Sequence, residues 1–271
     1  LRIIAPAKPG GGWDQTARSL SEVMAGLGAK GGTVENVPGA GGTVGLAQLV
    51  DQEKGKGNVL MVNGLVMMGA ILTNKSPVSL DMATPIARLT GEYEVIVVPA
   101  ASELKTVNDL VAKLKADPGA VAFGGGSAGG TDHILAGLIA KASGVDAAKV
   151  NYVPFKGGGE AIAAIIGGHV TAGVSGIGEF AEQVKGGRMR ALAVSSPAKI
   201  DGYPTLKEQG IDVELANWRG IFGAPGITAA QTDALINIIR GATESASWKE
   251  TLTKLGWSPI FLSGDPYKKF I

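Results

Sequence analysis

Two glycine-rich segments with the same layout contain the residues best suited to hold a ligand. Residues 8–14 (Lys-Pro-Gly-Gly-Gly-Trp-Asp) follow an apolar run and precede a stretch with helical periodicity at 15–27. Residues 124–132 (Gly-Gly-Gly-Ser-Ala-Gly-Gly-Thr-Asp) follow the apolar residues 120–123 and precede a second helical stretch. Each pattern predicts a strand, a tight turn and a helix start, with an aspartate where the helix begins.

The chemistry of such segments is anion binding. A helix N-terminus presents unpaired N–H groups and a partial positive charge, and glycine lets a ligand approach the backbone closely. Two such helix starts therefore predict one small anion that is held from two sides.

Composition limits the classes of protein that fit. A chain of 271 residues forms one large domain or two of ordinary size. A hydrophobic content of 45% with 18% charged residues indicates a globular protein with a sizeable core. The net charge of +1 argues against nucleic acid as a partner.

Several residue types needed for other chemistries are missing. The chain has no cysteine, which excludes disulfides, thiolate catalysis and cysteine-ligated metal. Its two histidines are isolated and its carboxylates scattered, so we expect no metal site and no cofactor. No run reaches the ~20 apolar residues of a membrane span. The chain begins on an expected strand, as does a mature exported protein whose signal peptide has been removed.

The order of elements predicts an α/β fold. Short runs rich in valine and isoleucine alternate with segments of helical periodicity, and Thr106–Asp109 and Thr228–Gln231 have the spacing of capping boxes. We expect a mostly parallel sheet flanked by helices on both faces. The predicted strands are residues 1–5, 59–62, 95–98, 121–123, 150–153, 170–174 and 190–194.

Domain boundaries are expected at two extended apolar segments, residues 92–101 and 214–224, each of which runs into a proline. If both cross between lobes, lobe one is 1–98 plus 219–271 and lobe two is 99–218. Each lobe then contributes one glycine loop to a ligand cleft between the lobes.

Two enzyme motifs also match the second loop. Gly125–Gly129 fits the G-x-S-x-G nucleophile elbow with Ser127, and Gly124–Gly129 fits the dinucleotide pattern G-x-G-x-x-G. His133 is too close to serve a Ser127 triad, His169 lies in an expected solvated turn, and the next strand ends in Lys156 rather than an acid. The alternative to a binding protein without catalysis is an enzyme acting on a small anionic substrate, with Ser127 as nucleophile or phosphate ligand.

The aspartates of the two loops, Asp14 and Asp132, allow two interpretations. They could act as a general acid and base, but an aspartate at a helix start more commonly caps the helix by accepting hydrogen bonds from its backbone N–H groups. We favour the second interpretation and leave ligand contact open as well.

Longer motifs resemble a known family. Residues 9–18 (Pro-Gly-Gly-Gly-Trp-Asp-Gln-Thr-Ala-Arg) and 34–45 (Val-Glu-Asn-Val-Pro-Gly-Ala-Gly-Gly-Thr-Val-Gly) are similar to the opening motifs of the TctC or Bug-type binding proteins of tripartite tricarboxylate transporters. Residues 123–133, 153–161, 167–170 and 217–226 match in order as well. The resemblance implies a two-lobed, periplasmic-binding-protein (Venus flytrap) fold in the bacterial periplasm. It also implies a monomer that captures a small di- or tricarboxylate and delivers it to a membrane permease.

The resemblance also implies which residues bind the ligand. Arg219 would meet a second carboxylate or form an interlobe salt bridge; Trp13 and Trp218 would wall the pocket or belong to the core. Residues 34–45 would shape a turn before a helix at 46–50. The expected ligand-binding residues are Gly11, Gly12, Trp13, Asp14, Asn63, Gly64, Leu65, Ser127, Gly130, Thr131, Asp132, Lys156, Gly157, Gly158, Trp218 and Arg219.

Overall fold

The computed structural model describes residues 1–28, 32–126, 128–155 and 158–271. The chain divides into two compact units: unit 1 is Leu1–Gly91 with Trp218–Ile271, and unit 2 is Glu92–Asn217. The chain leaves unit 1 within β4 (Thr84–Pro99) and returns within β9 (Ala216–Gly223). The two lobe boundaries predicted from the sequence lie inside these same two strands.

The sheet of unit 1 is built around β1 (Arg2–Ala5), which pairs in parallel with β2 (Thr33–Asn36) and with β3 (Val59–Gly64). Strand β3 is buried along its whole length and pairs antiparallel with β9. The first part of β4 pairs antiparallel with β10 (Ser258–Ser263). Because the carboxyl ends of β1 and β3 meet at one edge, the segments that follow them are brought together there.

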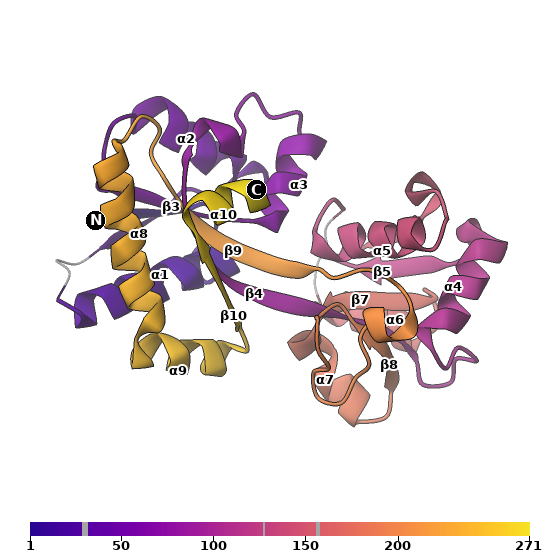
Figure 1. Cartoon of the computed structure of the whole chain (residues 1–271). Helices are drawn as coiled ribbons and strands as arrows, with labels where there is room; N and C mark the ends of the chain where they lie inside the picture. The colour runs from indigo at the N-terminus through magenta and orange to yellow at the C-terminus, as the bar shows by residue number, and fades with distance from the viewer. Residues whose placement is uncertain (29–31, 127, 156–157) are drawn as a thin grey trace. The chain divides into compact units, whose positions relative to one another are not determined.

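Helices pack on both faces of this sheet (Figure 1). Alternate residues of a strand point to opposite faces, and β9 shows this directly: Ile221 joins one core with α1 and α8, whereas Trp218 and Phe222 join a second core with α2 and α3. The helical segments of unit 1 are α1 (Gly12–Gly26), η1 (Ala40–Gly42), α2 (Thr43–Gln52), α3 (Leu65–Thr73), η2 (Leu80–Met82), α8 (Ala229–Glu244), α9 (Ala246–Leu255) and α10 (Gly264–Phe270).

Unit 2 repeats the arrangement. Strand β5 (Ala122–Gly125) pairs in parallel with β6 (Asn151–Pro154) and β7 (Ala172–Gly176), and β7 and β8 (Met189–Val194) both pair antiparallel with β4. Its helical segments are α4 (Val107–Ala116), η3 (Pro118–Ala120), α5 (Thr131–Ala142), η4 (Ala147–Lys149), α6 (Gly158–Ile166), α7 (Ile177–Lys185) and η5 (Lys207–Gln209).

The predicted α/β architecture is confirmed, and the sheets are mixed: parallel pairs surround β1 and β5, and antiparallel pairs form along the crossing strands β4 and β9. Both capping boxes form, Thr106 with Asp109 and Thr228 with Gln231. Among the described residues, no helix has the length and apolarity of a membrane-crossing segment.

The turn predicted within residues 34–45 is present, and its glycines have a clear steric role. Gly39, Ala40, Gly41 and Gly42 all have positive φ. A Cβ on Gly41 would lie 2.4 Å from the Cβ of Ala70, so this turn can pack on α3 only without a side chain there. The helix that follows, α2, begins at Thr43, three residues before its predicted start.

Helix α8 provides a test of which face supports the core. Ile239 is completely buried, whereas its neighbour Ile238 is 41% exposed. We expect Ile239→Ala to lower the free energy of unfolding by about 2–5 kcal/mol, because it removes buried methyl groups and leaves a cavity. Urea unfolding followed by tryptophan fluorescence measures this, since all four tryptophans lie in unit 1.

Ile238→Ala is the matched control, because it makes the same chemical change on the same helix. It should change the free energy of unfolding by less than about 0.5 kcal/mol. Equal losses in the two variants would contradict the assignment of the buried face.

Candidate functional site at two helix starts

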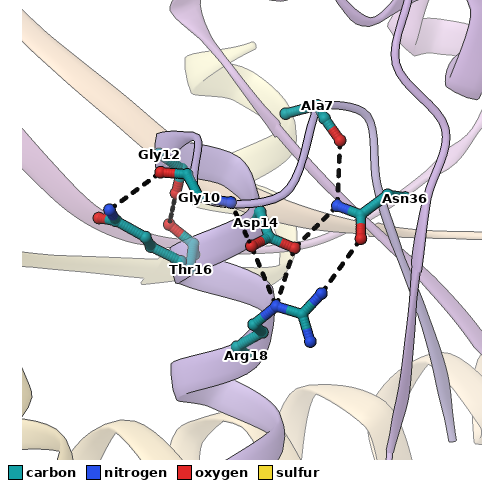
Figure 2. A network of polar contacts seen from close by, with 8 residues as sticks. Ala7, Gly10, Gly12, Asp14, Thr16, Arg18 and Asn36 are labelled. Carbon is teal, nitrogen blue, oxygen red and sulfur yellow. Dashed lines mark hydrogen bonds and ion pairs between the residues drawn. The ribbon is translucent and has the colours of Figure 1, made fainter.

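The first glycine loop is closed by Asp14, the third residue of α1. Its carboxylate accepts hydrogen bonds from the N–H of Gly10 at 2.8 Å, from Nδ2 of Asn36 at 2.7 Å and from Nε of Arg18 at 3.0 Å (Figure 2). Asn36 also donates to the carbonyl of Ala7, which ties the end of β2 to the loop (Figure 2). The prediction that Asp14 caps the helix is wrong: the backbone N–H that it accepts belongs to Gly10 in the loop, and not to the first helical turn.

This arrangement leaves the start of α1 open. The residue before the helix is Gly11, in an extended conformation, and no side chain caps the helix there. The N–H groups of the first turn therefore keep their partial positive charge for an external acceptor.

The Asp14 carboxyl is held in its charged form. Burial raises its pKa, but the hydrogen bonds from Arg18, Gly10 and Asn36 lower the pKa by more, so that the net shift is downward. Asp14 is 2% exposed. A carboxylate this buried fixes the loop only while these donors remain in place.

A cationic side chain lies against the same helix start. Arg219, on β9, is 8% exposed, and a Cβ on Gly12 would lie 2.8 Å from its Nη2 atom. Its guanidinium also lies over the Trp257 ring, 4.8 Å from the centroid. The guanidinium can occupy this place because residue 12 has no side chain. The positive charge of Arg219 adds to the partial positive charge of the helix start.

The end of β3 joins this group, and α3 follows it directly, so the loop predicted at residues 63–65 is absent. Gly64 pairs with Arg219 in the β3–β9 ladder, and a Cβ on Gly64 would lie 3.2 Å from Nε1 of Trp13. Unit 1 thus brings together Gly12, Trp13, Gly64 and Arg219, which are far apart in the chain.

The other predicted residues of unit 1 are more deeply placed. Asn63 is fully buried and accepts a hydrogen bond from the Tyr267 hydroxyl at 3.3 Å, while its Nδ2 has no partner among the described residues. Trp218 is 3% exposed and packs edge-on against Tyr267 and Phe270. Of the two interpretations of Trp218, core packing describes this position. Trp13 is half-buried and packs against both cores, and Leu65 lies at the edge of one of them.

The second glycine loop is closed in the same way. Asp132, the second residue of α5, accepts a hydrogen bond from the N–H of Gly126 at 2.6 Å, and the Tyr152 hydroxyl donates to the Gly126 carbonyl at 2.9 Å. The residue before α5 is Gly130, again extended and without a side-chain cap. His133 accepts the N–H of Gly129 at 3.0 Å and stacks on the Tyr152 ring.

The electrostatic environment of the second loop is the opposite of the first. Where Asp14 meets Arg18, Asp132 meets the buried carboxyl of Glu94 on β4. Burial raises the pKa of Glu94 well above its usual range, and the neighbouring Asp132 raises it further. Burial also raises the pKa of Asp132.

The described part of unit 2 leaves some predicted residues without a structural account. Ser127, Lys156 and Gly157 lie outside the described residues, and Gly158 is the first residue of α6. Thr131 is 4% exposed, and its hydroxyl has no hydrogen-bond partner among the described residues. His169 is exposed in a turn, as expected.

Four residues that complete the two loops were not predicted from the sequence: Arg18, Asn36, Glu94 and Tyr152. The spacing of Asp14 and Arg18, four apart on one helix, was a usable signal. The other three come from neighbouring strands, and no local pattern indicates which strand lies beside a loop. No group of three or more potential metal ligands occurs within the part of the chain that the structure describes.

Comparison with known proteins identifies the family. The family model of the tripartite tricarboxylate transporter family receptor, TctC, matches residues 16–271. The chain belongs to this family. The structure of a TctC solute-binding protein from Polaromonas is similar over the whole chain and 93% of that protein, with 26% identity and a TM-score of 0.85. The fold is that of the two-lobed periplasmic binding proteins.

Other relatives are similarly distant in sequence. The protein BugT of Bordetella pertussis is 28% identical over 279 residues, covering all of this chain and 84% of BugT. MatC from Rhodopseudomonas palustris, solved with bound malate, is 22% identical and has a TM-score of 0.71, over 95% of this chain and 88% of MatC. These similarities extend along essentially the full length of this receptor.

The charge of Asp14 should be visible in the acid stability of the receptor. A carboxyl whose pKa is lowered on folding stabilises the protein above its unfolded pKa of about 3.9, and this contribution is lost as the pH falls through the folded value. Asp14→Asn should therefore lower the free energy of unfolding by about 1–3 kcal/mol at neutral pH, because hydrogen bonds to a charged acceptor are lost. Thermal melting from pH 7 to pH 3 should show the gap to wild type closing at the acid end.

Asp51→Asn, at an exposed position near the end of α2, is the control and should leave the melting profile unchanged. A gap between wild type and Asp14→Asn that stays constant from pH 7 to pH 3 would argue against an ionised Asp14.

Proposed function

We propose that this receptor is a monomeric periplasmic protein that captures a small carboxylate of the di- or tricarboxylate type, without catalysis. It would deliver this ligand to the membrane permease of a tripartite tricarboxylate transporter. The observation that carries the proposal is the pair of uncapped helix starts, at α1 and α5, each preceded by a glycine loop that an aspartate holds in place. Such helix starts favour anions over neutral ligands.

Structural neighbours support the class of ligand. MatC was solved with malate, and another Rhodopseudomonas palustris protein, 18% identical with a TM-score of 0.73, was solved with adipate. Both ligands are dicarboxylates. At this level of identity the neighbours share the fold, and the carboxylate preference of this receptor rests on its own helix starts.

Arg219 suggests which carboxylates the receptor prefers. We propose that the first-turn N–H groups of α1 bind one carboxylate and that the Arg219 guanidinium, packed against Gly12, binds a second. A guanidinium can hold a carboxylate through two parallel hydrogen bonds, a geometry that lysine does not reproduce. Dicarboxylates should therefore bind more tightly than monocarboxylates of the same length.

A thermal-shift screen tests the ligand class. Acetate, butyrate, succinate, malate, adipate and citrate would be compared with the diamides of the dicarboxylates. At 100 times its dissociation constant a ligand adds about 2.7 kcal/mol of stability, so a bound carboxylate should raise the melting temperature clearly while its amide does not. Stabilisation by neutral sugars alone, or saturable ester hydrolysis that Ser127→Ala abolishes, would contradict the proposal.

The role of Arg219 is tested by comparing two arginines that each lie over an aromatic ring. Arg219→Met should weaken dicarboxylate binding by about 1–3 kcal/mol and monocarboxylate binding far less, since only the second carboxylate loses its partner. Arg240→Met is the control, because Arg240 is exposed and lies over Phe261. Isothermal titration calorimetry gives the ratio of the two affinities, and an unchanged ratio in Arg219→Met would show that Arg219 has only a structural role.

A further inference from the structure

The carboxyl of Glu94 is buried directly behind the second glycine loop. Glu94 is 2% exposed, and its side chain is hydrogen-bonded to that of Asp132, which in turn accepts the N–H of Gly126. The backbone of the loop packs tightly against these groups at Gly125. A Cβ on Gly125 would lie 2.8 Å from the Cβ of Asp132 and 2.6 Å from the Tyr152 hydroxyl.

In the part of unit 2 that the structure describes, the groups that surround Glu94 do not neutralise a second negative charge. Its electrostatic neighbours are acids: Asp132 on α5, Glu92 on the same strand and Glu179 on α7. Ser195, which follows β8, contacts the backbone of Glu94, since its hydroxyl accepts the Glu94 N–H at 2.9 Å. From β6, the Tyr152 hydroxyl donates to Gly126 rather than to either carboxyl.

The basic groups of the described residues do not neutralise the pair either. Within the described ranges, no lysine or arginine forms an ion pair with Glu94 or Asp132. His133 stacks on Tyr152 and uses Nδ1 to accept the Gly129 N–H; burial lowers its pKa, which favours the neutral ring. Among the described residues, the pair therefore has no cation like Arg18, which pairs with Asp14 in unit 1.

This geometry requires a proton between the two carboxyls. A hydrogen bond can join two carboxyl groups only if one of them is protonated. Oε2 of Glu94 is also buried without a hydrogen-bond partner in the described structure, which is costly for a carboxylate and much less so for a neutral acid. Two carboxylates this close and this buried do not ionise together, and burial raises the pKa of both groups.

We propose that Glu94 and Asp132 hold one proton between them when the receptor binds its anionic ligand, and that loss of this proton weakens binding. This inference rests on the proposed function, since it concerns the loop of unit 2 that leads into the uncapped start of α5. Glu94 is a positioning residue, because it acts through Asp132 on the loop.

Loss of the shared proton would act in two ways. It would place a second negative charge close behind a helix start that binds an anion, which opposes the field of the helix. It would also remove the hydrogen bond that holds Asp132 in the orientation in which it accepts the Gly126 N–H. Ligand binding would then be linked to one proton, and affinity would fall by about tenfold per pH unit once the pair loses that proton.

The first experiment needs no ligand. A carboxyl whose pKa is raised on folding stabilises the protein at low pH, and this contribution is lost as the pH rises through the folded value. The melting temperature of Glu94→Gln should therefore rise relative to that of wild type as the pH increases above about 4.3, the ordinary pKa of glutamate. A purely structural role for Glu94 would give an offset that does not depend on pH and would overturn the proposal.

Carbon-13 NMR of the carboxyl groups in the ligand-free wild type provides a second readout that does not depend on the variant folding. One carboxyl should titrate well above the usual range. If every glutamate and aspartate titrates within the usual range, the shared proton does not exist and the proposal fails.

The second experiment measures binding as a function of pH with succinate, malate, adipate and citrate as probes. For wild type, the dissociation constant of a probe that binds should rise about tenfold per pH unit on the alkaline side, and Glu94→Gln should lack this rise. Asp109→Asn is the matched control: Asp109 also accepts backbone N–H groups at a helix start of unit 2, but it is exposed and faces no second acid. Its pH profile of binding should follow wild type.

The two proposals fail in different ways. If no carboxylate probe binds at any pH while the ligand-free titration shows the raised carboxyl, the proposed function is wrong and the shared proton stands without its role in binding. If a probe binds with the same pH profile in wild type and in Glu94→Gln, the proposed function stands and the link between the proton and binding is overturned.

Discussion

A single type of hydrogen bond organises both candidate ligand loops: an aspartate in the first turn of a helix accepts the N–H of a glycine that precedes the helix. Asp14 does this with Gly10, and Asp132 with Gly126. Because each aspartate is used by its loop and the residue before each helix is a glycine, neither helix start has a side-chain cap from its N-cap residue. The conformation of the loop and the availability of the helix start therefore depend on the same carboxylate.

In each unit, neighbouring residues contact the carboxyl group of that aspartate. In unit 1 the support is polar and cationic, from Asn36 at the end of β2 and from Arg18 on the helix itself. In unit 2 it comes from an acid, Glu94, on a strand that is buried between two antiparallel neighbours. The same backbone arrangement thus has one loop whose aspartate is charged near neutral pH and one whose charge, as proposed, depends on a shared proton. The difference follows from the neighbours of each aspartate: Arg18 on the helix for Asp14, and the buried Glu94 for Asp132.

The sequence predicted the parts of this structure that depend on local patterns. The strands at 59–62 and 190–194, both capping boxes and the two helix starts follow from periodicity and from glycine, which act within a few residues. Strand β2 was missed because Thr33–Asn36 is short, polar and only partly buried. Glu94 and Tyr152 could not be assigned to the second loop, because their place beside it is set by strand pairing across many residues. The burial that alters their protonation exists only after the sheet has formed.

The Arg219 guanidinium fills the space in which a side chain at position 12 would lie. This guanidinium comes from a strand more than two hundred residues away in the chain. A side chain at position 12 would therefore displace the guanidinium, which stands at the end of a long and flexible side chain and would turn away from the start of α1. If Arg219 meets the ligand as proposed, a substitution at position 12 would alter ligand binding by moving the guanidinium, without any change to the loop that holds the helix start.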